Sequence, residues 1–193
     1  MEMGSDIAQR NLQRAAELVT SFKQVAADQT SAQRRRFDLR EVCDEIVLTL
    51  RPVLKQCDAQ VVMSVPEGLV LDSYPGALWQ VLTNLVTNAI THAFEGHPSP
   101  RITITAAALG PDRVAMNVAD NGQGIAPELL PRIFDPFVTT RMGRGGTGLG
   151  LHIVHNLVFN TLGGSVSVKS QVGEGTEFQL ELPLIAPAQA KPE

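Results

Sequence analysis

Apolar residues recur with helical spacing in the first part of the chain and with strand-like alternation further on. Within residues 6–34, which contain no Pro or Gly, apolar positions fall three or four residues apart at Leu12, Ala15, Val19, Phe22 and Ala26. This spacing predicts one amphipathic helix. It also favours pairing with a partner helix, and an arm folded onto its own domain is the alternative.

The triplet Arg34-Arg35-Arg36 marks a boundary, and strand-like and helical segments alternate beyond it. We expect strands near 37–39, 59–65, 69–72, 101–108, 113–119, 164–169 and 176–183, and helices over about 40–56, 75–94 and 148–161. Antiparallel strands alternating with helices predict an α+β fold. Its form is a two-layer α/β sandwich, with helices on one face of a sheet, preceded by the long N-terminal helix. The last segment, residues 185–193, is rich in Ala and Pro and is expected to be a disordered tail.

Charge and cysteine content narrow the function classes. The 193 residues carry a formal net charge of −4, from 16 Lys and Arg against 20 Asp and Glu, which gives no general attraction to nucleic acid or anionic membranes. Any anion site must therefore be local. The only cysteines, Cys43 and Cys57, share a predicted helix face with Ile46 and Leu50, so they fit a core position better than a metal or redox site. A reduced, cytoplasmic location is the default expectation.

No segment has the character of a signal peptide or a membrane span. The longest stretch without Asp, Glu, Lys or Arg, Ser73 to Phe94, contains Gln80, Asn84 and Asn88, which argue against a bilayer environment. Residues 1–5, MEMGS, are interpreted as a cloning remnant.

The segment TNLVTNAITHAF, residues 83–94, places Asn84 and Asn88 one helical turn apart, and Thr91 and His92 continue that face. Asn is a mediocre helix former, and buried amides need hydrogen-bond partners. A pair of them on an otherwise apolar helix therefore indicates a ligand site. The alternative is a pair of satisfied core amides.

Glycine-containing stretches supply further candidates. In ADNGQGIAP, residues 119–127, Asp120 ends a predicted strand and can accept a hydrogen bond from a ligand, while Gly122 and Gly124 let the backbone turn closely around it. In RMGRGGTGLGLHIV, residues 141–154, five glycines lead into a helix and predict a phosphate site. The turn VGEGTEF, residues 172–178, is interpreted as structural only.

Two familiar phosphate-binding motifs do not fit the second stretch. It lacks the G-K-[ST] of a Walker A loop. Gly143, Gly145 and Gly148 satisfy G-x-G-x-x-G, but no strand immediately precedes them and no acid follows where a ribose contact would be expected, so a Rossmann interpretation fails.

Taken together and in order, these stretches resemble the ATP-binding domain of sensor histidine kinases, within the superfamily of gyrase, Hsp90, MutL and histidine kinases (GHKL, or Bergerat fold). The resemblance assigns the N box to Gln80–Phe94, the first glycine box to Asp120–Gly124, the F box to 133–140 (IFDPFVTT) and the second glycine box to Gly146–Leu151. It covers 37–184 as the ATP-binding domain. Residues 6–36 resemble the second helix of the dimerisation and phosphotransfer hairpin.

The resemblance implies a role for each motif. Asn88 would bind the Mg²⁺ that bridges the phosphates of ATP, Asn84 would face the same phosphates as the second catalytic residue, and Asp120 would accept from the adenine amino group. Phe134 and Phe137 would shape and anchor the loop that closes over the nucleotide. Further nucleotide-binding residues are His92, Gly122, Gly124, Ile125, Phe137, Thr139, Thr140, Arg141, Arg144, Gly146, Thr147, Gly148, Leu149, Gly150 and Leu151.

Asn84 also indicates the type of reaction. The superfamily's ATPases place a Glu here to activate water, and an amide has no basic lone pair for that task. This favours a kinase over an ATPase that hydrolyses ATP to drive a conformational change.

Where many relatives carry a Lys, this chain has Thr91, so Arg141 or Arg144 could balance the phosphate charge. A solvated basic loop is the alternative.

The phosphoacceptor of the family is missing. None of the four histidines, His92, His97, His152 and His155, lies within 6–34, and none is followed by Asp or Glu. The chain is therefore expected to bind ATP and Mg²⁺ without phosphorylating itself. His152 and His155, at i, i+3, fit helix packing or a nucleotide contact better than a metal pair.

The expected partners are a hairpin helix that carries the phosphoacceptor His, a response regulator, and a second copy joined through the N-terminal helix in the intact protein. Nucleic acid and direct membrane insertion are not expected. The expected location is cytoplasmic, including the cytosolic part of a membrane-bound sensor. Two alternatives are a serine kinase of the anti-sigma type on the same fold, and a non-catalytic nucleotide-binding module that acts by dimerising.

Overall fold

The computed structural model describes residues 33–140 and 146–189. The expected helix over 6–34 lies almost entirely outside these residues, as do Arg141 and Arg144. The described part is built on a five-stranded sheet. Its strands, in spatial order, are β2 (Gln60–Ser64), β4 (Arg101–Leu109), β5 (Arg113–Asp120), β7 (Gly175–Pro183) and β6 (Ser165–Gln171).

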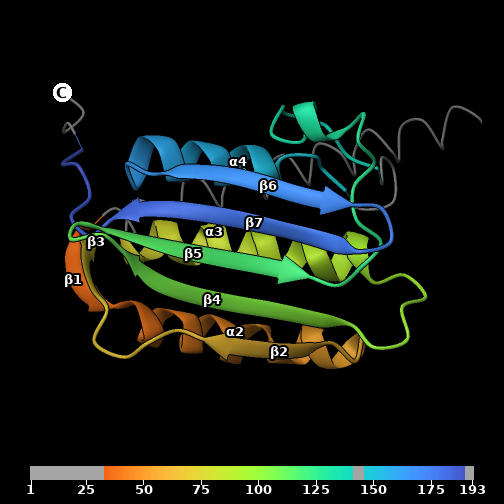
Figure 1. Cartoon of the computed structure of the whole chain (residues 1–193), viewed down its shortest axis with the longest axis horizontal. Coiled ribbons are helices and arrows are strands. Elements are labelled where there is room, and N and C mark those ends of the chain that lie inside the picture. The colour runs from red at the N-terminus through yellow and green to blue at the C-terminus, as the bar shows by residue number, and fades with distance from the viewer. Residues whose placement is uncertain (1–32, 141–145, 190–193) are drawn as a thin grey trace, which may run out of the picture.

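Three helices lie on one face of this sheet and leave the other face open, so the molecule has two layers (Figure 1). They are α2 (Leu39–Gln56), α3 (Pro75–Asn88) and α4 (Gly150–Asn156). The second and third end in π-helical turns, Ala89–Ala93 and Leu157–Thr161, and a 3₁₀ turn, Leu130–Arg132, precedes the loop that leads to α4. The predicted α+β sandwich is therefore confirmed.

The sequence of each helix explains its position. Asp38 caps α2, because its Oδ1 accepts from the backbone N of Arg40 at 2.8 Å. Pro75 stands at the start of α3, where its missing N–H costs nothing. The buried face of α3 carries Ala77, Leu78, Val81, Leu82, Leu85 and Val86 at helical spacing. This face packs toward the sheet and leaves the amides of the helix on another side.

Two features of the strands differ from expectation. The sheet is mixed, because β2 pairs in parallel with β4, whereas every other neighbouring pair in it is antiparallel. A helix connects β1 (Arg35–Asp38) to β2, and β1 does not join this sheet but pairs with β3 (Val70–Ser73) in a separate two-stranded sheet. Hydrophobic alternation identifies strands but does not carry the identity of their partners.

The boundary near residue 36 also shifts. Arg35 and Arg36 belong to β1 rather than to the end of the predicted helix over 6–36. The side chain of Arg34 forms a two-pronged ion pair with Asp72 of β3, with both N–O distances at 2.9 Å. This pair lowers the pKa of the Asp72 carboxyl. The arginine triplet therefore belongs to the domain, through the ion pair of Arg34 and the pairing of β1 with β3.

Residues 185–189 correct the expectation of a disordered tail from 185 onward. Ile185 bridges to Asp72, Ala186 is buried, and the backbone N of Gln189 donates to the hydroxyl of Tyr74, which itself donates to the carbonyl of Pro187. Backbone pairing and one buried tyrosine hold a segment that composition alone marks as unstructured. Residues 190–193 lie outside the described part.

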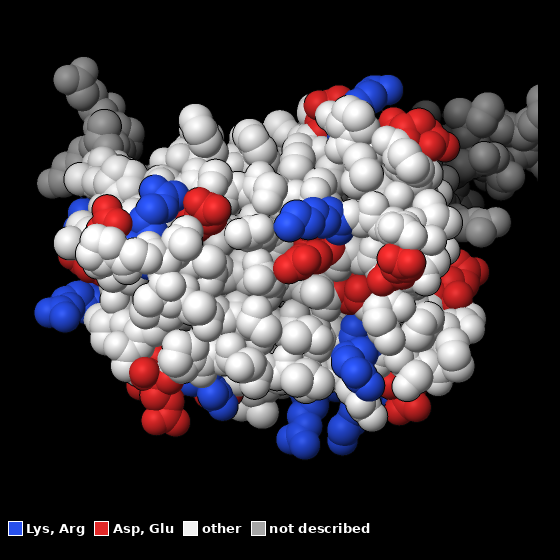
Figure 2. Space-filling model, viewed as in Figure 1, with Lys and Arg blue, Asp and Glu red and all other residues white. Residues whose placement is uncertain are grey.

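Charges of both signs are scattered over the open face of the sheet, without a patch of one sign (Figure 2). This distribution agrees with the modest net charge of −4 and gives no basic track on the viewed face. Within residues 33–140 and 146–189, none of the helices has the length and apolar character needed to cross a membrane.

The two thiols are expected to differ sharply in reactivity. Cys43 is fully buried, and burial is the main cause that raises the pKa of its thiol to about 12, whereas Cys57 is half-buried at the end of α2; both are free. Since the thiolate is the reactive form, a thiol reagent at pH 8 should label Cys57 and leave Cys43 unlabelled until the chain is unfolded. Cys57→Ser should abolish native labelling. Rapid labelling in that variant would contradict the core position of Cys43.

Candidate functional site

A cavity of about 280 Å³ lies between the helical layer and the end of the sheet. One wall is formed by α3 and the π-helical turn after it, and the opposite wall by the end of β5 and the start of β7. The loop before α4 and the first residues of α4 form the remaining side. This volume is just below the usual range for small-molecule sites, and the cavity combines apolar walls with a few polar groups, as such sites do.

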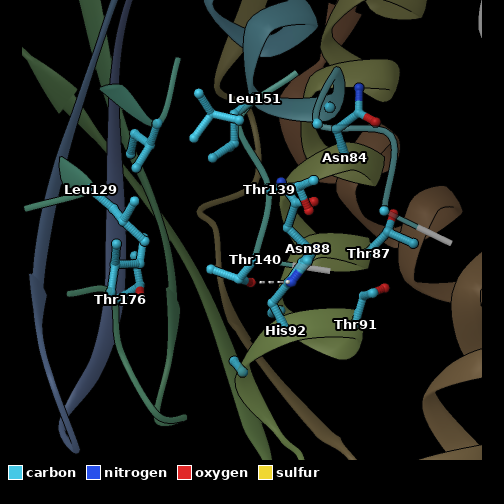
Figure 3. Close-up of a pocket in the computed structure, with 18 of the residues that line it drawn as sticks. Asn84, Thr87, Asn88, Thr91, His92, Leu129, Thr139, Thr140, Leu151 and Thr176 are labelled. Atoms are coloured by element: carbon cyan, nitrogen blue, oxygen red, sulfur yellow. Dashed lines mark hydrogen bonds between the residues drawn. The ribbon is translucent and has the colours of Figure 1, made fainter. Parts of the chain in front are cut away.

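The helical wall carries a row of polar side chains four residues apart, Asn84, Asn88 and His92, with Thr87 and Thr91 beside them (Figure 3). The row exists because the apolar face of α3 is turned to the sheet. The Nδ2 of Asn84 is buried and has no hydrogen-bond partner among the residues that the structure describes. A buried amide without a partner costs free energy, so this group is suited to a ligand that enters the cavity.

The start of α4 approaches the same amides closely. A side chain at Gly150 would place its Cβ 3.4 Å from Oδ1 of Asn88 and 3.7 Å from Oδ1 of Asn84. Because Gly150 has no side chain, the space in front of the two amides stays open. Asn88 thereby presents a hard oxygen ligand to the cavity.

Asp120 stands at the end of β5 on the wall opposite the amides. Its Oδ1 accepts from the backbone N of Gly122 at 2.9 Å, and the backbone N–H of Thr176 also donates to the carboxyl. Burial raises the pKa of Asp120, and these two hydrogen bonds oppose the rise. The result is a fixed, largely desolvated acceptor.

Two glycines allow the turns around Asp120 to pack closely. Gly124 has φ +70°, and a Cβ there would clash with the carbonyl of Gln171; Gly175 has φ +99°, and a Cβ there would clash with the carbonyl of Asp120. Both positions therefore require glycine for conformation and for space. The turn 121–125 is thus pressed against the β6–β7 turn, which fixes the direction of Asp120.

The loop after the 3₁₀ turn closes the third side of the cavity. The Oγ1 of Thr140 lies 3.2 Å from Nδ1 of His92, so the loop is tied to the helical wall (Figure 3). Phe137 has φ +66°, the residue is 56% exposed, and its backbone N donates to the carbonyl of Gly148 at 2.9 Å. Phe134 packs instead against Phe178 and His155.

Most of the predicted site residues come together around this one cavity. Those that line it are Asn84, Asn88, His92, Asp120, Gly124, Ile125, Thr139, Thr140, Gly146, Thr147, Gly148, Gly150 and Leu151. Gly122, Phe137 and Leu149 do not line it. Gly122 lies against Ala93 behind Asp120, and Phe137 contributes its backbone near Gly148. Their direct contact with a ligand stays a prediction.

Several lining residues were not identified from the sequence. They are Thr87, Ala89, Ala93, Gln123, Leu129, Ile133, Val138, Thr176 and Phe178, whereas Thr91, which the sequence placed on the face of the two amides, also lines the cavity. The most informative is Thr176, which the sequence placed in a purely structural turn. Only the strand register brings it to Asp120, as its direct partner across β5 and β7. A polar residue just after a glycine turn was the only signal available.

The two histidines of α4 are held by contacts with neighbouring residues. Nδ1 of His152 is 3.0 Å from the carbonyl of Phe134, and its Nε2 is 3.0 Å from Nδ2 of Asn156, while His155 stacks on Phe159. Helix packing accounts for both side chains. Among residues 33–140 and 146–189, there is no group of three or more His, Cys, Asp and Glu side chains suited to a metal ion.

The residues present fit a nucleotide that carries phosphates and a magnesium ion. The partnerless buried amide of Asn84, the open space left by Gly150 and the oxygen of Asn88 face one end of the cavity. The fixed acceptor Asp120 faces the other side. Oxygen ligands are those that Mg²⁺ prefers. The site thus defines a nucleotide-binding protein of the two-layer α/β type.

Comparison with known proteins agrees with this assignment. The family described as histidine kinase-, DNA gyrase B-, and HSP90-like ATPase matches residues 74–186, more than half of the chain, and the chain belongs to this family. It is 44% identical over 128 residues to the two-component sensor PprA of Pseudomonas aeruginosa. The matching region covers 64% of this chain but only 14% of PprA. The chain therefore spans a small part of this relative.

Two solved structures are similar throughout the described domain. The catalytic domain of histidine kinase ThkA in a nucleotide-free form superposes with a TM-score of 0.70 at 28% identity, covering 79% of this chain and 97% of that domain. Full-length ShkA in complex with AMPPNP gives a TM-score of 0.67 at 31% identity, covering 81% of this chain and 32% of ShkA.

Proposed function

We propose that this chain is the ATP-binding catalytic part of a two-component sensor histidine kinase. It transfers the γ-phosphoryl of ATP to a histidine on a separate dimerisation helix. The observation that carries the proposal is the pair Asn84 and Asn88 facing Asp120 across one cavity. The relatives PprA and ThkA, a two-component sensor and a histidine kinase, support the same activity, and the AMPPNP bound by ShkA supports ATP as substrate.

The two walls of the cavity support a separate role for each residue. Asp120 accepts from the exocyclic amino group of adenine and sets the orientation of the base. Asn88 gives its side-chain oxygen to Mg²⁺, which, when bound, neutralises phosphate charge and orients the γ-phosphoryl. Asn84 donates its partnerless Nδ2–H to a phosphate oxygen. The backbone around Gly146–Gly150 supplies further donors to the phosphates.

Transfer to a side chain is favoured over hydrolysis by the chemistry of Asn84. An amide cannot accept a proton at neutral pH, so no general base stands at this position to activate water. Catalysis then consists of positioning and of charge stabilisation, which leaves the phosphoryl group available to an incoming imidazole. The phosphohistidine would next pass its phosphoryl group to an Asp of a response regulator.

The test uses γ-labelled ATP and Mg²⁺ with this chain alone and then with a separate hairpin that carries the phosphoacceptor His. We expect acid-labile, base-stable label on the hairpin and little free phosphate. A hairpin with that His replaced by Gln is the matched control and should stay unlabelled. The variant Asn160→Ala, in the exposed π-helical turn after α4, should transfer normally.

Three results would contradict the proposal. Rapid phosphate release by the chain alone would indicate an ATPase that activates water without Asn84. Acid-stable label on a serine would indicate a serine kinase of the anti-sigma type. Binding of Mg·ATP without transfer to any hairpin would indicate a nucleotide-binding dimerisation module.

For the intact protein, we infer a homodimer formed through the N-terminal helix, a response regulator as downstream partner, and a cytoplasmic location for this part of the protein. Arg141 or Arg144 is proposed to balance phosphate charge in the place of the Lys that many relatives carry where this chain has Thr91.

A further inference from the structure

Ser170, the last residue but one of β6, connects the two glycine turns next to Asp120. Its Oγ accepts from the backbone N of Ile125 at 2.8 Å, donates to the carbonyl of Gly175 at 2.8 Å, and lies 2.9 Å from Oγ1 of Thr176. One half-buried hydroxyl thus contacts the first glycine turn, the β6–β7 turn and a side chain of the cavity wall.

The strand register places these groups in one row. Asp120 of β5 pairs with Thr176 of β7, and Thr176 pairs in turn with Ser170 of β6. Side chains of directly opposed residues in antiparallel strands lie on the same face of the sheet. Thr176 therefore stands between Asp120 and Ser170 at the wall of the cavity, opposite Asn88 and His92 (Figure 3).

The number of protons fixes the direction of the hydrogen bond between the two hydroxyls. A serine hydroxyl has one proton and can accept twice. The proton of Ser170 goes to the carbonyl of Gly175, which can only accept. The hydrogen bond between Ser170 and Thr176 must then use the proton of Thr176. Thr176 consequently presents only lone pairs to the cavity.

We propose that Ser170 is a positioning residue for base selection, which makes Thr176 an obligate hydrogen-bond acceptor beside Asp120. Two neighbouring acceptors match a purine with an amino group at position 6, which donates. They reject a purine with a carbonyl oxygen there, because acceptor would face acceptor. Ser170 does not contact the base itself but acts through Thr176 and through the backbone of Ile125. The inference rests on the proposed function, in that adenine lies against Asp120.

The test compares two diphosphates by calorimetry without metal, ADP and purine riboside 5′-diphosphate, which lacks the 6-amino group. For Ser170→Ala we expect ADP to bind about five- to tenfold more weakly, the effect of one lost hydrogen bond. Purine riboside diphosphate should bind within about twofold of its affinity for the unchanged chain, since it makes no bond through the amino group. A general loss of packing would weaken both ligands equally, and that result would overturn the proposal.

Two variants make the comparison sharper. Ser170→Thr keeps a hydroxyl at the same place and should restore the preference for ADP, while Ser167→Ala, an identical change at an exposed position of the same strand, should leave both affinities unchanged. If Ser170→Thr fails to restore the preference, the hydroxyl is not responsible and the proposal is wrong.

The failure of this inference can be told from the failure of the proposed function. If the unchanged chain prefers ADP and Ser170→Ala keeps the full preference, Ser170 has no positioning role and only this inference falls. If the unchanged chain binds the two diphosphates equally, neither Asp120 nor Thr176 reads the amino group, and this inference falls together with the role given to Asp120. The proposed phosphoryl transfer fails only if the labelled hairpin assay fails.

Discussion

Replacing Asp120 with Asn is expected to weaken binding of adenine nucleotides about a hundredfold, because a charged acceptor gives way to an amide whose NH₂ group can face the amino group of adenine. A lost hydrogen bond to a charged group and a new donor–donor contact both act in this direction. Binding of ADP is measured by calorimetry. Asp112→Asn, in the exposed turn between β4 and β5, is the matched control and should bind ADP normally.

The fold of this variant should stay cooperative. Burial raises the pKa of Asp120 in the folded chain, so the folded state holds the proton more tightly than the unfolded state does. The stability associated with this group is therefore present at low pH and is lost as pH rises through the raised pKa. At neutral pH the ionised Asp120 opposes folding, and Asp120→Asn removes that charge. A variant that is unfolded at 25 °C would show that Asp120 has a mainly structural role.

The same raised pKa predicts a pH dependence of binding. As pH falls through it, the carboxyl of Asp120 takes up a proton and loses part of its capacity to accept, so affinity for ADP should fall at a pH above that expected for an exposed aspartate. Asp120→Asn should lack this step. Equal binding of GTP and ATP by the unchanged chain would contradict the role given to Asp120.

Asn88→Ala should weaken binding of Mg·ATP about ten- to a hundredfold and metal-free ADP by much less. The reason is that the lost oxygen serves the metal and the phosphates, whereas the base is held on the opposite wall. The two affinities are measured side by side, and the labelled hairpin assay should show a matching loss of transfer.

Asn160→Ala is the matched control, because it makes the same change in an exposed π-helical turn outside the cavity. Its affinities for Mg·ATP and for ADP should equal those of the unchanged chain. If Asn88→Ala weakens the two ligands equally, Asn88 has a structural role, and the magnesium ligand must be sought elsewhere in the site.

The local elements could be predicted because each has its own pattern. The apolar spacing of α3 and the alternation in β4 and β5 gave these elements within a few residues. The π-helical turn after Asn88 was not predicted, because it continues the apolar pattern of the helix and changes only the hydrogen bonding. The parallel pairing of β2 with β4 was missed because a strand's own residues do not encode its neighbour.

The candidate site was predictable wherever a residue was unusual for its element. Amides on an apolar helix and an acid at a strand end stood out, and the structure brings Asn84, Asn88 and Asp120 to one cavity. Thr176 and Ser170 gave no such signal, since a hydroxyl in or beside a glycine turn is ordinary. Their significance comes from the row that three paired strands form with Asp120.

By itself, the sequence determined the two-layer α+β class, the membership of an ATP-binding family and the identity of the polar groups available to a nucleotide. These follow from periodicity and from residue chemistry, which act locally. Tertiary structure alone decided which residues meet. It bound the C-terminal segment to Tyr74 and paired β1 with β3. It also brought the hydroxyls of Ser170 and Thr176 within hydrogen-bond distance of each other. Such contacts join residues far apart in the chain, and their geometry is fixed only when the sheet and the helices pack together.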